Sequence, residues 1–60
     1  MTNLSAKEFF DEGNNAFVLG RLIDAKELYK KTIVSNPYFL EGYYNLGITY
    51  KKLGKFKKAE

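Results

Sequence analysis

The stretch that decides the fold is YYNLGITYKKLGKFKKA, which occupies residues 43–59. A second stretch, FFDEGNNAFVLGRLIDA, lies 34 positions earlier at residues 9–25 and follows the same pattern. The identical positions are Gly13 and Gly47, Leu19 and Leu53, Gly20 and Gly54, and Ala25 and Ala59. Self-similarity at a period of this length is typical of stacked helical repeats, so the sequence predicts an internal repeat of helix pairs.

Helix boundaries follow from local signals around these stretches. Ser5 and Glu8 form a capping box, which predicts that a first helix begins near Ser5. Apolar residues then recur at helical spacing up to Gly20, where the first helix is expected to stop. A second helix is expected from there to Asn36-Pro37, although Arg21 is a poor residue for its start.

A third apolar series runs from Phe39 to Leu53-Gly54, the same pair that closes the first helix. The sequence therefore predicts a third helix that ends at Gly54, followed by the stub of a fourth over residues 55–60. Gly13, Ala25 and Gly47 are small residues on stripes of bulky ones, which predicts close approach of paired helices at each. The residues expected to fill the space beside them are Phe9, Leu22, Tyr29, Tyr43 and Tyr50.

Composition limits the functions that are available. The 60 residues include no cysteine and no histidine, so neither a disulfide framework nor a metal site of those ligands can be built. Without these residues no nucleophile, base and orienting group can be assembled, and we expect no catalysis and no cofactor. No apolar run is long enough to span a membrane and no leader pattern opens the chain, which favours a soluble, cytoplasmic protein.

The second stretch resembles the tetratricopeptide repeat family through Tyr43, Leu46-Gly47, Tyr50, Gly54, Phe56 and Ala59. The first does so through Phe9, Gly13, Gly20, Leu22, Ala25, Tyr29 and Pro37. It departs from the family at Glu12, Ala16 and Thr32, as in a polar amino-terminal cap. The resemblance implies an all-α fold of antiparallel helix-turn-helix repeats, stacked as a right-handed α-solenoid of about one and two-thirds repeats. It implies one domain over residues 1–60, with a first repeat at 6–39 and a truncated second repeat at 40–60.

The same resemblance implies a scaffold or adaptor that binds a peptide or partner protein on the concave groove formed by the first helix of each repeat. The residues expected on this groove are Phe10, Asn14, Phe17, Tyr44, Asn45, Ile48, Lys51 and Lys52. The asparagines match those that contact a peptide in one subfamily, but the lysine of that subfamily is replaced by Phe10. Ordinary solvated positions for the asparagines, and half-buried packing for the aromatic residues, remain the alternatives.

The incomplete second repeat has two interpretations. The pattern breaks off inside a helix, which favours a fragment of a longer array; self-association of copies is the alternative. Residues 1–28 hold three basic and five acidic side chains and residues 29–60 hold seven and two, so a head-to-tail contact between copies would bring opposite charges together. In either case Tyr43, Leu46, Tyr50 and Phe56 are expected to form an exposed apolar edge. Nucleic-acid binding is the weaker alternative, and it rests on Lys51, Lys52, Lys55, Lys57 and Lys58.

Overall fold

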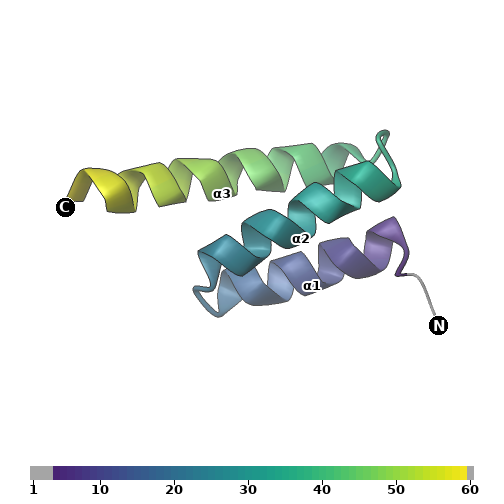
Figure 1. Cartoon of the computed structure of the whole chain (residues 1–60), viewed down its shortest axis with the longest axis horizontal. Helices are drawn as coiled ribbons and strands as arrows, with labels where there is room; N and C mark the ends of the chain where they lie inside the picture. The colour runs from purple at the N-terminus through teal and green to yellow at the C-terminus, as the bar shows by residue number, and fades with distance from the viewer. Residues whose placement is uncertain (1–3, 60) are drawn as a thin grey trace.

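A computed structural model describes the backbone of residues 4–59 and the side chains of residues 4–55. It contains three helices, α1 (Ala6–Val18), α2 (Leu22–Ser35) and α3 (Leu40–Ala59). Figure 1 shows α1 and α2 as an antiparallel hairpin, with α3 along the other side of α2 and running past the hairpin at its carboxyl end. The described backbone has no strand, which confirms the all-α prediction.

The start of α1 is fixed by the predicted capping box. The Glu8 amide donates to Ser5 Oγ at 3.2 Å, and the Ser5 amide donates to Glu8 Oε1 at 2.9 Å. Because these hydrogen bonds favour the ionised carboxylate, they hold the pKa of Glu8 below its usual value. The box therefore satisfies two free amides at the helix end.

The turn between α1 and α2 depends on Gly20. Its φ of +80° lies in the left-handed region, which glycine adopts without steric cost. The Arg21 amide donates to Ala16 O at 2.9 Å and the Gly20 amide donates to Phe17 O at 3.0 Å, the two hydrogen bonds of a Schellman motif. Arg21 gives α2 no side-chain cap, as predicted.

The core lies between α2 and its two neighbours. Tyr29 is 1% exposed and its ring covers Gly13, so closely that a Cβ there would lie 2.7 Å from Tyr29 Cε1. Ala25 is fully buried beside it. The predicted close approach is therefore confirmed at Gly13 and Ala25. It is wrong for Gly47, which is exposed and where an added Cβ would have no neighbour within 4 Å, because no helix lies against that face of α3 within the described residues.

Two threonines are buried in the interior without leaving a polar group unpaired. Thr32 and Thr49 are both 0% exposed. Each hydroxyl donates to the carbonyl one turn earlier, at 2.9 Å for Leu28 O and 2.8 Å for Asn45 O. Thr32, which departs from the family pattern, therefore leaves no hydroxyl without a partner. Glu12, another departure, lies on the exposed surface.

The predicted end of the third helix at Gly54 is wrong. Helix α3 continues through Gly54 to Ala59, so no separate stub of a fourth helix forms over the described backbone. The turn at Gly20 is stabilised because α2 folds back and buries Ala25 and Tyr29 against α1. After Gly54 the described backbone instead stays helical through Ala59, so the helix keeps its backbone hydrogen bonds there.

The predicted apolar edge of α3 is only partly present. Tyr43 and Tyr50 are 46% and 48% exposed, as expected. Leu46 is only 9% exposed because it faces α2 and joins the core of Ala25 and Tyr29, so its predicted exposure is wrong. The Phe56 side chain lies outside the described residues.

Candidate functional site

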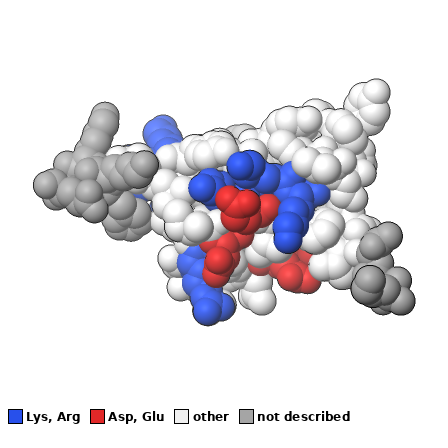
Figure 2. Space-filling view, in the orientation of Figure 1, with Lys and Arg blue, Asp and Glu red and all other residues white. Residues whose placement is uncertain are grey.

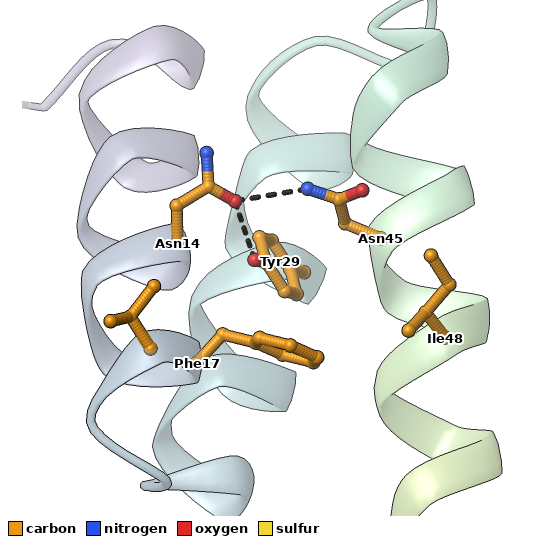
Figure 3. Close-up of a pocket in the computed structure, with 6 residues that line it drawn as sticks. Asn14, Phe17, Tyr29, Asn45 and Ile48 are labelled. Carbon is orange, nitrogen blue, oxygen red and sulfur yellow. Dashed lines mark hydrogen bonds between the residues drawn. The ribbon is translucent and has the colours of Figure 1, made fainter.

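One pocket lies across the gap between α1 and α3, with α2 at its floor. It has a volume of about 200 Å³ and is lined by Asn14, Phe17, Val18, Tyr29, Asn45 and Ile48. Figure 3 shows the side chains of α1 and α3 facing one another across it, with the Tyr29 ring between them. Four of the eight residues predicted for the groove therefore line a single pocket, namely Asn14, Phe17, Asn45 and Ile48.

A hydrogen-bond network forms the polar part of this pocket. Tyr29 donates its hydroxyl proton to Asn14 Oδ1 at 2.5 Å, and Asn45 Nδ2 donates to the same oxygen at 2.9 Å (Figure 3). The three helices are thus joined through one amide oxygen. Within residues 4–55, Asn14 Nδ2 and Asn45 Oδ1 make no side-chain hydrogen bond, so an amino group and an amide oxygen of the lining residues have no partner there.

Tyr29 keeps its proton in this setting. Burial raises the pKa of Tyr29 above its ordinary value of 10.0, and the Asn45 side chain offsets part of that rise. The hydroxyl is therefore a donor at neutral pH, and it fixes the side chain of Asn14.

The other walls of the pocket are apolar and lead to a basic region. Val18 is 83% exposed, and Phe17 and Ile48 are half-buried. An adjoining cleft of about 380 Å³ is lined by Ile48, Lys51, Lys52 and Lys55. Lys52 Nζ lies 5.6 Å from the centroid of the Phe17 ring, so this cation also borders the first pocket.

Charge is distributed unevenly between the hairpin and α3. Ion pairs on the hairpin join Lys7 to Asp11, Arg21 to Asp24, and Lys26 to Glu27. Figure 2 shows acidic and basic side chains interspersed on one face of the molecule. None of the three lysines lining the adjoining cleft forms an ion pair within the part of the chain whose side chains are described.

Two predicted groove residues lie elsewhere. Phe10 packs into the interior, with its ring centroid 5.8 Å from that of Tyr29 and 5.0 Å from that of Phe39. This half-buried packing is the alternative to a groove position that the sequence left open for the aromatic residues. Tyr44 is 70% exposed and lies outside the pocket lining. Lys51 and Lys52 lie beside the pocket, in the adjoining cleft.

The sequence prediction missed the Tyr29 hydroxyl as a site group, because Tyr29 was expected only to fill space beside a glycine. A signal was available, since a buried tyrosine hydroxyl requires a hydrogen-bond partner. Among residues 4–55 no group of three or more acidic side chains could hold a metal ion, and no described helix is long and apolar enough to cross a membrane.

Comparison with known proteins gives one family. A family model described as tetratricopeptide repeat matches residues 28–60, from the second half of α2 through α3. Neither the curated proteins nor the solved structures contain a match to this chain.

Proposed function

This chain belongs to the tetratricopeptide repeat family, and we propose that it binds a peptide segment of a partner protein in the pocket between α1 and α3. Members of this family are generally protein–protein interaction modules and are typically non-catalytic. The observation that carries the proposal is the network of Asn14, Tyr29 and Asn45, which leaves the Asn14 amino group and the Asn45 amide oxygen unused in a pocket that also has an apolar wall.

The free groups fit the chemistry of a peptide backbone. A peptide unit offers a carbonyl acceptor and an amide donor, which complement Asn14 Nδ2 and Asn45 Oδ1 respectively. Because Asn14 Oδ1 accepts two hydrogen bonds, both amides are held in place before a ligand arrives. Binding then costs less side-chain entropy than it would with freely rotating asparagines.

The walls supply contacts to the side chains of the same segment. Phe17, Val18 and Ile48 form an apolar surface of the kind that receives one anchoring side chain. The lysines of the adjoining cleft would attract an acidic residue further along the peptide.

The test is selection of binders from a displayed random-peptide library, followed by calorimetric titration against variants. Asn45→Ala removes a network residue, and Asn15→Ala is the matched control because Asn15 is exposed on α1 outside this pocket. Loss of one hydrogen bond, about 0.5–1.5 kcal/mol, predicts a two- to tenfold weaker affinity for Asn45→Ala and an unchanged one for Asn15→Ala. Peptides that bind both variants as tightly as the unmodified chain would refute the assignment of the pocket.

A further inference from the structure

The lysines beside the pocket lie on the same face of α3 as the pocket residues. Ile48 lines both the pocket and the adjoining cleft, so the two meet at its side chain. Lys52 and Lys55 follow Ile48 at spacings of four and three, which places them along one face of the helix. Lys52 also lies against Phe17 of α1, with Nζ 5.6 Å from the ring centroid. The position of Lys52 is therefore set by two helices that the structure describes, and its ammonium group borders both the pocket and the cleft.

Neither the end of the helix nor the contact with Phe17 accounts for the charge of Lys52. The carbonyl groups at the end of a helix favour cations, but this effect falls off within the last turn. Helix α3 continues through Gly54 to Ala59, so Lys52 lies about two turns before that residue. An ammonium group over an aromatic ring also keeps its charge and its remaining hydrogen-bond donors. The cation at Lys52 is thus available to a ligand.

The described side chains provide the cleft with no counter-charge. It is lined by Ile48 and by Lys51, Lys52 and Lys55, without an acid. Lys51 and Lys55 lie one turn apart, an arrangement of like charges that weakens a helix. The one acidic residue among residues 40–59 is Glu41, in the first turn of α3. Glu41 lies about 21 Å from Lys55 along the axis, whereas physiological salt screens an exposed charge within about 8 Å. An anion bound in the cleft would relieve this unbalanced repulsion.

The order of charges along α3 gives the groove a direction. Glu41 lies one turn before Asn45, and Lys52 lies one turn after Ile48, so the face is acidic before the pocket and basic beyond it. An acid of the ligand is therefore attracted to one side of the pocket only.

The spacing along α3 fits an extended peptide. Ile48 and Lys52 are about 6 Å apart along the helix axis. Two residues of an extended peptide span about 6.4–6.8 Å, and side chains two residues apart point to the same face. In a peptide that lies along α3, an apolar side chain held between Phe17 and Ile48 therefore brings the side chain two residues away to Lys52.

We propose that the peptide bound by this chain carries an aspartate or glutamate two residues from its apolar anchor, on the side toward the carboxyl end of α3, and that Lys52 selects this acid. The inference rests on the proposed function, because the anchor in the pocket fixes where the acid lies. Lys51 and Lys55 strengthen the positive potential around the carboxylate. A peptide with lysine or arginine at that position is rejected by the same cations.

The first test reads the preference from the peptides themselves. Binders selected from a displayed random library against the unmodified chain should be enriched in aspartate or glutamate two residues from an apolar residue. The same selection against Lys52→Glu should favour lysine or arginine there. Lys30→Glu is the matched control, because Lys30 is an exposed lysine of α2 that lines a different cleft, with Phe9 and Val34. Peptides selected against the control should keep the acid.

The second test is calorimetric titration with exchanged charges, with helix content checked by circular dichroism. Exposed ion pairs are weak, and reversal of one charge turns attraction into repulsion. Lys52→Glu should therefore weaken binding of the selected acidic peptide about three- to tenfold, and Lys30→Glu less than about twofold. The peptide with lysine in place of its acid should bind Lys52→Glu about threefold more tightly than it binds the unmodified chain. A pocket damaged by the loss of the contact with Phe17 would not show this rescue.

The outcomes separate this inference from the proposed function. Peptides that bind Asn45→Ala more weakly, but bind Lys52→Glu as tightly as the unmodified chain, would overturn the selection by Lys52 and leave the pocket assignment intact. Peptides unaffected by Asn45→Ala would overturn both, whatever their response to Lys52→Glu, because the acid is placed by an anchor in the pocket. A single-stranded oligonucleotide that binds more tightly than the selected peptides, and is weakened more than they are by Lys52→Glu, would make the cleft a nucleic-acid contact and overturn the inference.

Discussion

Gly13→Ala should destabilise the fold, whereas the same change one repeat later should stabilise it. A Cβ at Gly13 would lie 2.7 Å from Tyr29 Cε1 and 2.8 Å from Tyr29 Cδ1, closer than carbon atoms pack. The ring cannot move aside freely, because Tyr29 is 1% exposed and its hydroxyl is bonded to Asn14. At Gly47 a Cβ meets nothing within 4 Å.

The magnitudes follow from two terms. Alanine is better than glycine inside a helix by about 0.5–1 kcal/mol, and this gain applies at both positions. Overpacking of a dense core costs about 1–3 kcal/mol, and this cost applies only at Gly13. Gly47→Ala should therefore raise the free energy of unfolding by about 0.5–1 kcal/mol, while Gly13→Ala should lower it by up to about 2.5 kcal/mol.

Urea denaturation followed by circular dichroism measures both variants, at protein concentrations too low for self-association. The difference between the two unfolding free energies isolates the overpacking term, since the helix term is common to both. In a Tyr29→Leu background, where no ring covers Gly13, the penalty of Gly13→Ala should shrink. Equal stabilities for Gly13→Ala and Gly47→Ala in the unmodified background would refute the close contact between α1 and α2.

Two further changes test the turn and the pocket network. Gly20→Ala forces alanine to a φ of +80° and should cost about 1–2 kcal/mol, whereas Gly54→Ala lies within α3 and should gain about 0.5–1 kcal/mol in thermal melts. A loss of stability in both variants would mean that Gly54 forms a turn like that at Gly20. The raised pKa of Tyr29 favours the protonated hydroxyl in the folded state, so its stabilising contribution is complete below pH 10.0 and is lost as pH rises through the raised value. Tyr29→Phe should show a smaller alkaline loss of urea midpoint than the unmodified chain, and identical losses would contradict the burial of this hydroxyl.

The sequence predicted the hairpin well because its signals are local. The capping box at Ser5 and the glycine turn at Gly20 each act through neighbouring residues, and both are present in the structure. The end of α3 could not be predicted in the same way. Leu53-Gly54 repeats Leu19-Gly20, yet one pair is helical and the other turns. After Gly20 the chain folds back and α2 packs on α1, whereas the described backbone after Gly54 continues in the same helix, and a local pattern does not distinguish the two outcomes.

The candidate site was also predicted only in part from the sequence. The resemblance brought Asn14 and Asn45 to one face, and the structure places them 2.9 Å apart through their amide atoms. It also implied a groove position for Phe10, whose ring instead packs against Tyr29 and Phe39. A pattern of residue types predicts which side chains share one face of a helix. Whether that face lines the groove or packs into the core depends on how the helix is rotated about its axis against its neighbours. The role of the Tyr29 hydroxyl required the same three-dimensional information.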